Sequence, residues 1–329
     1  AAHAARFQHA RYGRSFPGLL PDWGQSPQSA RIHLVGHSQG GQTARVLTSL
    51  LANGDEQERQ ATAPEDLHPL FRGGREWVHS VTTLSTPHDG STLATILAGE
   101  ADHLLGWLLA LASYLGHHYR DAPSYDFKLD QWQLVQGENE SDQQFRQRLQ
   151  NSNLWQQDDI ATWDLRPAGA KQLNARYPAA QSTYYFSWAT QDSVAAPGGR
   201  RFVPAVGMNL ILMSTSLAIG EYLDPEPGPG LPAFDQFWWP NDGVVNTLSM
   251  SGPRIGSADH IINMSEGQAW TGFAPGVWHF MGVLQGWDHL DIIGQQTRLD
   301  VRSFYLQLGA LLANLPEQPL SESPVLPLP

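Results

Sequence analysis

The strongest constraint on the fold is a strand–turn–helix pattern in residues 31–53. Residues 32–35 form a short β-prone run, and residues 44–51 carry apolar side chains at helical spacing before an Asn-Gly pair ends the segment. Between the two runs, residues 36–40 match G-x-S-x-G. In this context the pattern is typical of a nucleophile elbow, a strained turn that holds Ser38 at the carboxyl end of a strand. The alternative is a structural βα turn, because the pattern alone is not specific in a chain with 31 glycines.

Two details of this turn follow from its expected geometry. We expect Gly36 and Gly40 on either side of the serine because the turn brings neighbouring backbone too close for a Cβ atom. The backbone N–H of Gln39, directly after Ser38, is expected to point toward the reacting hydroxyl. It is therefore a candidate oxyanion donor.

Composition limits the classes of function open to the chain. Its 329 residues are enough for one large α/β domain with insertions or for two domains. The net charge of −12 argues against nucleic-acid binding, which needs a basic face. The sequence has no cysteine, which excludes disulfides and thiol catalysis, and no apolar run of about 18 residues that would predict a transmembrane helix. It starts Ala-Ala-His-Ala, so we expect a processed mature form or a chain lacking an amino-terminal piece.

After the turn, apolar strands are separated by polar or helical segments. Strands are predicted at residues 77–84, 183–188 and 278–282, and a last helix at about residues 298–314. The Pro-rich residues 315–329 are predicted to be a disordered tail.

Residues 104–115 are apolar on nearly every face of a predicted helix and too few to span a bilayer. One interpretation is a mobile lid that covers an apolar cleft in water and opens on a lipid surface. The other is an ordinary buried helix. The run alone does not decide between them.

A nucleophilic serine needs a histidine to take its proton and a carboxylate to orient that histidine. In this fold the chain order is Ser, then Asp or Glu, then His. Asp242 and His289 follow Ser38 in that order, each in a loop after an apolar segment. His260 and His279 are the alternative bases. His37 is expected to orient the turn, with its side chain directed away from the serine hydroxyl.

Five stretches, in order along the chain, resemble the metal-containing lipases of the Geobacillus–Staphylococcus family. They are residues 36–45, 85–92, 125–132, 241–253 and 288–294. The resemblance covers residues 1 to about 312, and the set is far more specific than any single motif. It implies an α/β-hydrolase fold with a helical lid insertion.

The resemblance implies a secreted enzyme that cleaves triacylglycerols at an oil–water interface, with Ser38, Asp242 and His289 as its triad. It favours the lid interpretation of residues 104–115. The implied organisation is one hydrolase domain over residues 1–314, with the lid and a zinc region inserted at about 95–180. It implies no protein partner.

Family members of this type carry a structural zinc ion held by two Asp and two His. His3 and His9 match the histidine ligands, and Asp159 matches one acid, with Asp158 as the alternative. The fourth ligand, an Asp, is expected upstream of residue 1. Imidazole and carboxylate suit zinc. Without the resemblance, His3 and His9 would be interpreted as surface histidines, because residues six apart do not share a face of one helix.

The family also binds calcium through a backbone carbonyl that matches Gly207 and an acid that matches Asp291. A second acid position is occupied here by Gln296. Calcium takes several hard oxygen ligands, so replacing a carboxylate by an amide removes one charge from the site.

The chain departs from the family pattern ahead of Ser38. The family takes a second oxyanion donor from a His-Gly-Phe turn after an early strand, and no such motif occurs in the 37 residues before the serine. One lost donor costs ~10²–10³ in rate. The fold expects several strands there, and without them residues 32–35 would form an exposed apolar edge. We therefore expect an amino-terminally incomplete copy of a functional lipase, and an assay beside a chain extended by the missing segment would decide whether it is active as it stands.

The sequence thus predicts a triacylglycerol lipase that works through an acyl-enzyme. One alternative keeps the triad and changes the substrate to short soluble esters or polyesters. The other is a lipid-surface-binding protein with a decayed hydrolase fold, against which the intact Ser38, Asp242 and His289 set argues.

Overall fold

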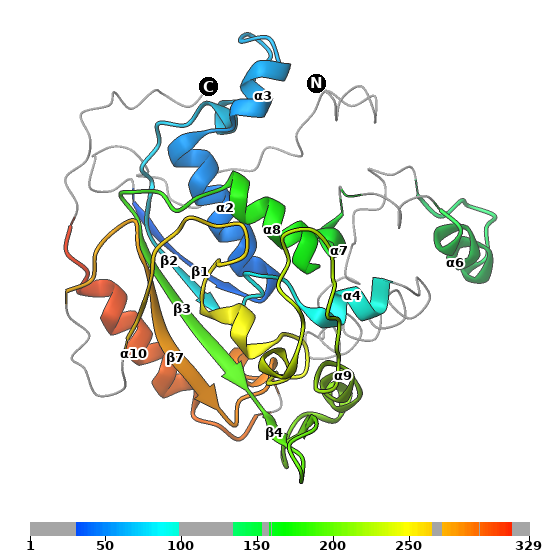
Figure 1. Cartoon of the computed structure of the whole chain (residues 1–329). Helices are drawn as coiled ribbons and strands as arrows, with labels where there is room; N and C mark the ends of the chain where they lie inside the picture. The colour runs from blue at the N-terminus through cyan, green and yellow to red at the C-terminus, as the bar shows by residue number, and fades with distance from the viewer. Residues whose placement is uncertain are drawn as a thin grey trace.

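The computed structural model describes residues 31–98, 134–152, 158, 160–264, 272–295 and 297–317. Within these ranges, a five-stranded sheet lies between helices (Figure 1). All neighbouring strands of the sheet are parallel. In spatial order they are β1 Ile32–His37, β2 Val78–Leu84, β3 Tyr184–Gln191, β7 Trp278–Gln285 and β6 Ile261–Asn263.

The described helices connect these strands or extend from their carboxyl ends. They are α2 Gln39–Asn53, α3 Glu56–Ala61, α4 Thr92–Ala98, α6 Asp142–Gln150, α7 Ala161–Asp164, α8 Pro167–Arg176, α9 Met213–Ile219 and α10 Val301–Ala313. Short 3₁₀ turns cover Pro69–Arg72, Leu210–Leu212, Gln236–Trp238, Thr247–Ser251 and Asp291–Ile293. A small antiparallel hairpin pairs β4 Ser193–Ala195 with β5 Phe202–Pro204.

The parallel α/β architecture agrees with the fold class predicted from the sequence. The first strand and helix lie where the 31–53 pattern predicted them, and Gly54 ends α2 with a left-handed φ of 71°. Strand β6 and the β4–β5 hairpin were not predicted. Their strands are only three residues long, too short for a periodic pattern.

Apolar side chains fill both faces of the sheet. Helix α10 packs on one face of the sheet and α2 on the other (Figure 1). The α10 side buries Leu84, Tyr184, Phe186, Trp188, Met281, Ile292 and Leu308. The α2 side buries Leu51, Val78, Val81, Tyr185 and Trp278. Both layers therefore fix the strands whose carboxyl ends carry the candidate site.

The two ends of the predicted domain have different surroundings. Strand β1 is at one edge of the described sheet, and its Val35 side chain is 47% exposed. At the other end, Leu315 packs into the α10 side of the core, and the carbonyl of Pro316 accepts a hydrogen bond from the hydroxyl of Tyr184. Ordered packing thus continues past residue 314.

Some predicted features lie outside the described residues. These are the lid segment 104–115, the motif 125–132 and residues 318–329 of the predicted tail. Among the residues that are described, no helix is long and apolar enough to cross a membrane.

Candidate active site

Ser38 lies at the carboxyl end of β1, where the chain turns directly into α2. Its φ of 55° and ψ of −132° are strained for a residue with a side chain. Its backbone N–H donates to the carbonyl of Leu84 at 2.9 Å, which ties the turn to the end of β2. Gln39 is the first residue of α2, where a backbone N–H has no acceptor within its own helix. The local geometry is that of a nucleophile elbow.

Only one of the two motif glycines is required by close packing. A Cβ atom on Gly36 would lie 2.6 Å from the backbone of Gly40, whereas a Cβ on Gly40 would have no neighbour within 4 Å. The second crowded position is Gly41, whose Cβ would collide with the side chain of Thr86. The expectation that Gly40 is needed for space was therefore wrong. The helix turns Gly40 outward and directs Gly41 toward the loop after β2.

Asp242 and His289 come together although 47 residues separate them. The Nδ1 atom of His289 donates to Oδ2 of Asp242 at 2.8 Å, and the backbone N–H of His289 donates to the carbonyl of Asp242 at 3.0 Å. The other carboxylate oxygen accepts from the backbone N–H groups of Val244 and Val245. Both side chains are almost fully buried. This arrangement fixes the ring orientation and, in the neutral ring, leaves Nε2 without a proton.

His37 links the elbow to the histidine loop. Its ring lies 4.5 Å from that of His289, measured between centroids, and its Nε2 lies 2.8 Å from the backbone carbonyl of His289. Burial first, and the nearby His289 second, lower the pKa of His37 to about 3. The ring is therefore neutral at pH 7 and donates from Nε2 to that carbonyl. Since His37 directly precedes Ser38, this contact brings the His289 loop beside the elbow.

The two alternative bases lie in other surroundings. His279 is buried in β7, where Nδ1 lies 3.1 Å from the carbonyl of Tyr185 and Nε2 accepts from the backbone N–H of Ala274. His260 is exposed just before β6. Of the three histidines considered, only His289 contacts Asp242 among the described interactions.

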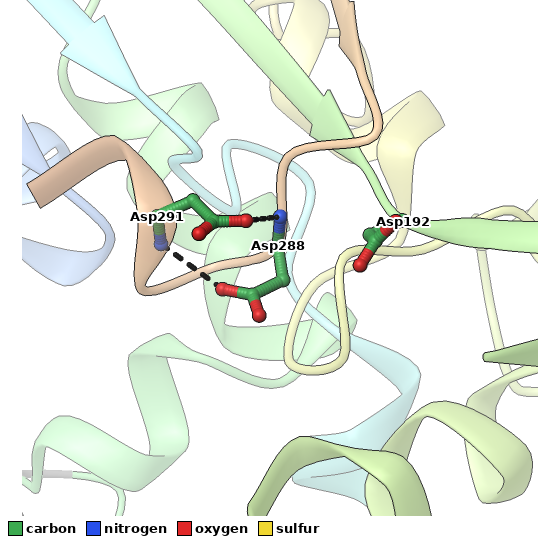
Figure 2. Close-up of side chains that lie close together, drawn as sticks. All are labelled: Asp192, Asp288 and Asp291. Carbon is green, nitrogen blue, oxygen red and sulfur yellow. Dashed lines mark hydrogen bonds between the residues drawn. The ribbon is translucent and has the colours of Figure 1, made fainter. Parts of the chain in front are cut away.

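A second group of acids lies next to this site. The carboxylates of Asp192, Asp288 and Asp291 offer oxygens that all lie within 4.8 Å of one another (Figure 2). Asp192 follows β3, and the other two flank His289. The backbone N–H of Asp291 donates to Asp288, and the backbone N–H of Asp288 donates to Asp291. The described ion pairs include no partner for any of the three acids.

The electrostatics of this acid cluster are unfavourable for three charges. Burial and the carboxylates of Asp288, Asp291 and Asp242 raise the pKa of Asp192 to about 6. Burial also raises the pKa of Asp288. A buried group of hard carboxylate oxygens without a counter-charge has the donor chemistry of a calcium site.

The predicted calcium residues are partly brought together. Asp291 belongs to the acid cluster, and the backbone N–H of Asn209, two residues after Gly207, donates to Asp288 at 2.8 Å. The loop that carries Gly207 is thus tied to the cluster. Gln296 lies outside the described residues.

The predicted zinc ligands His3, His9 and Asp159 also lie outside the described residues. Asp158, the alternative acid, is exposed.

Three residues at this end of the sheet, Asp288, Asp192 and Thr190, were not predicted from the sequence. Asp288 lies within a quoted motif, directly before His289, so its neighbours in sequence were a usable signal. Asp192 and Thr190, whose hydroxyl donates to Asp242 at 2.7 Å, lie at the end of a strand with no motif. Only the pairing of β3 between β2 and β7 brings them to the site.

Several known proteins are similar to nearly the whole length of this chain. Lipase 2 of Staphylococcus aureus is 34% identical over 318 residues, which cover 95% of this chain and 42% of that protein. The chain thus spans less than half the length of this curated relative. Among solved structures, EstA from Clostridium botulinum is 39% identical with a TM-score of 0.82, covering 95% of this chain and 71% of EstA.

Two further solved structures are similar. Lipase 1 from Pelosinus fermentans is 39% identical with a TM-score of 0.78, over 96% of this chain and 81% of the lipase. Staphylococcus hyicus lipase is 28% identical with a TM-score of 0.72, over 95% of this chain and 76% of the lipase. Residues 1–315 match the family described as the lipase-like C-terminal domain. With a strained serine turn, a buried Asp–His pair and these relatives, the chain belongs to the lipase-like C-terminal domain family, of the staphylococcal lipase type.

Proposed function

We propose that this chain hydrolyses carboxylic esters of lipids by acyl transfer through Ser38. The observation that carries the proposal is the 2.8 Å hydrogen bond between His289 and Asp242, in a loop held against the elbow by His37. Relatives named lipases at 34–39% identity support the substrate class. The strained backbone of Ser38 supports its role as nucleophile.

In the proposed mechanism, His289 takes the proton of Ser38 while the hydroxyl oxygen attacks the ester carbonyl. Asp242 holds the ring in the tautomer with the proton on Nδ1 and stabilises the imidazolium that forms. The backbone N–H of Gln39 donates to the oxyanion. His289 then protonates the leaving alcohol, and water releases the acid from the acyl-enzyme.

Apolar surface near the site supports a lipid substrate. Val206 is fully exposed and Leu210 is 81% exposed, and both flank the loop that Asn209 ties to Asp288. Exposed apolar side chains beside a catalytic loop favour long acyl chains or a lipid surface over small polar esters. The alternatives remain a carboxylesterase or polyester hydrolase with the same triad, and an inactive lipid-surface-binding protein.

The deciding experiment compares the wild-type chain with Ser38→Ala on emulsified triacylglycerol and on p-nitrophenyl esters of increasing chain length. We expect hydrolysis by the wild type, with long chains preferred, and loss of at least about 10³-fold in the variant. A phosphonate ester should label Ser38, as read by peptide mass. A wild-type chain that neither hydrolyses esters nor is labelled would support the inactive alternative.

Extending the chain by the expected amino-terminal segment with a His-Gly-Phe turn provides a second test. If a second oxyanion donor is missing here, the extended chain should be about 10²–10³-fold faster. Equal rates would contradict the expectation of an incomplete copy.

We further propose that Asp192, Asp288 and Asp291 hold a calcium ion together with the loop around Gly207. Calcium would supply positive charge to buried carboxylates and would join β3, the Gly207 loop and the His289 loop. This role is structural, and no step of the proposed reaction uses the ion.

Zinc at His3, His9 and Asp159, a lid at residues 104–115 and secretion stay proposals that rest on the family resemblance. Metal analysis of the purified chain, with His3→Ala and His9→Ala as controls, tests the zinc. One zinc per chain, lost in both variants, is the expected result.

A further inference from the structure

We propose that Thr190 and Ser85 are positioning residues that set the charge and orientation of Asp242 toward His289. This inference rests on the proposed function for its kinetic consequences, but the hydrogen bonds that carry it do not. Neither residue belongs to the Ser38, Asp242 and His289 set. Both side chains are fully buried at the carboxyl ends of neighbouring strands.

The contacts form a short chain of hydroxyl groups that ends on the carboxylate. The hydroxyl oxygen of Ser85 lies 2.7 Å from that of Thr190, and the hydroxyl of Thr190 donates to Oδ2 of Asp242 at 2.7 Å. Oδ2 is the same oxygen that accepts from Nδ1 of His289. The threonine hydroxyl and the imidazole therefore both donate to one carboxylate oxygen, and together they orient it.

The direction of these hydrogen bonds is fixed by proton counting. An ionised carboxylate only accepts, so the single hydroxyl proton of Thr190 is used on Asp242. Thr190 can then only accept from Ser85, which makes Ser85 the donor. The backbone of Ser85 adopts a left-handed φ of 52°, and its N–H donates to the carbonyl of Trp188 at 3.0 Å. Strain at a buried serine indicates that its surroundings hold it there.

Thr190 is itself held in place by its neighbours. Its carbonyl accepts from the hydroxyl of Thr247 at 3.0 Å, and the sulfur of Met250 lies 3.2 Å from its backbone nitrogen. Because β3 is a central strand, the hydroxyl position follows from the sheet and not from a flexible loop. Such support is what precise orientation of a catalytic carboxylate requires.

Loss of the threonine hydroxyl has a predictable consequence. With one donor fewer, the negative charge on Oδ2 is less stabilised by hydrogen bonds and attracts the imidazolium proton more strongly. His289 then gives up its proton less readily. We expect Thr190→Val to lower kcat about 10-fold with KM unchanged and to move the acidic limb of the kcat/KM profile to higher pH by about half a unit to one unit.

The test uses four single variants of the full chain and one double variant. Thr190→Ser keeps the hydroxyl and should restore both the rate and the pH profile. Thr183→Val is the matched control, because it removes a buried threonine hydroxyl at the opposite end of β3, where that hydroxyl donates to the carbonyl of Val78. Ser85→Ala should cause a smaller effect than Thr190→Val. In the Thr190→Val background, Ser85→Ala should add nothing, because Ser85 acts through Thr190.

A readout independent of activity separates this inference from the proposed function. The low-field proton resonance of His289 Nδ1–H should shift in Thr190→Val, return in Thr190→Ser and stay in place in Thr183→Val. A shifted resonance in a chain without esterase activity would overturn the proposed function and leave this inference standing. An active chain in which Thr190→Val changes neither the pH profile nor the resonance would overturn the inference.

Discussion

Asp242 and the acid cluster of Asp192, Asp288 and Asp291 are two sets of buried carboxylates at the same end of one sheet. Each oxygen of Asp242 accepts two hydrogen bonds, two from backbone N–H groups and two from the side chains of Thr190 and His289. In the acid cluster, backbone N–H groups donate to both oxygens of Asp288 and to one of Asp291, whereas no described hydrogen bond reaches the carboxylate of Asp192. Burial and neighbouring carboxylates raise the pKa of Asp192 and of Asp288. The first carboxylate has hydrogen-bond donors from the protein on both oxygens, whereas the second group has no counter-charge among the described ion pairs.

This difference shows how neighbouring acids take opposite roles. A carboxylate with donors on both oxygens stays charged inside a protein and can orient a histidine. Carboxylates that lie close to one another repel even where backbone N–H groups donate to them, as to Asp288, and that repulsion is relieved by a metal ion or by a proton. The 288–291 loop carries both roles, because His289 joins Asp242 while its neighbours join the cluster.

The largest expected effect comes from Asp242→Asn. An amide cannot hold His289 in the same tautomer, so ester hydrolysis should fall by about 10⁴-fold. The measurement is kcat on a soluble p-nitrophenyl ester. Asp259→Asn is the control, because Asp259 bonds Ala179 and Trp278 at the opposite end of the strands. A loss below about 10-fold in Asp242→Asn would contradict the assigned role.

The second-largest expected effect is stabilisation of the fold by calcium bound at the acid cluster. Calcium at about 100 times its Kd should stabilise the fold by about 2.7 kcal/mol relative to EDTA, because it binds only the assembled carboxylates. Thermal unfolding measures this, with magnesium as the comparison ion. Asp291→Asn should remove most of the gain. If calcium stabilised Asp291→Asn against thermal unfolding as much as it stabilises the wild type, Asp291 would be excluded as a ligand.

The smallest expected effect is a pH dependence of the free energy of unfolding of the calcium-free chain. Because the pKa of Asp192 is raised to about 6 in the fold, the folded chain keeps a proton that the unfolded chain has lost above about pH 4. Stability in EDTA should therefore fall as pH rises from 4 to 6, by at most about 1.4 kcal/mol per pH unit. Asp192→Asn should flatten this slope in urea unfolding. A slope unchanged by the substitution would show that other groups cause it.

Much of the fold was accessible from local pattern. The 31–53 run predicted β1, the turn and α2 because strand period, glycine punctuation and helix period follow one another within 23 residues. The buried strands β2, β3 and β7 were predicted as apolar runs, although β3 and β7 continue several residues further. Three-residue strands carry no such pattern, and β6 was missed for that reason.

The candidate site was likewise predicted only in part from the sequence. The order of Ser38, Asp242 and His289 was readable because each follows an apolar segment in a motif-rich loop. The contacts of His37 and Thr190 were not readable, since His37 reaches the carbonyl of His289 across 252 residues and the hydroxyl of Thr190 reaches Asp242 across 52 residues. Close packing requires a glycine at Gly41 and not at Gly40, because the orientation of the helix decides which of the two residues faces Thr86.

The sequence by itself determined the serine turn, the parallel α/β class and the residues that can carry acyl-transfer chemistry, because these depend on short-range periodicity and residue type. Only the tertiary structure decided which carboxylate oxygen each donor reaches and which acids lie close to one another. Those outcomes depend on strand order in the sheet, which brings together side chains that no local interaction connects.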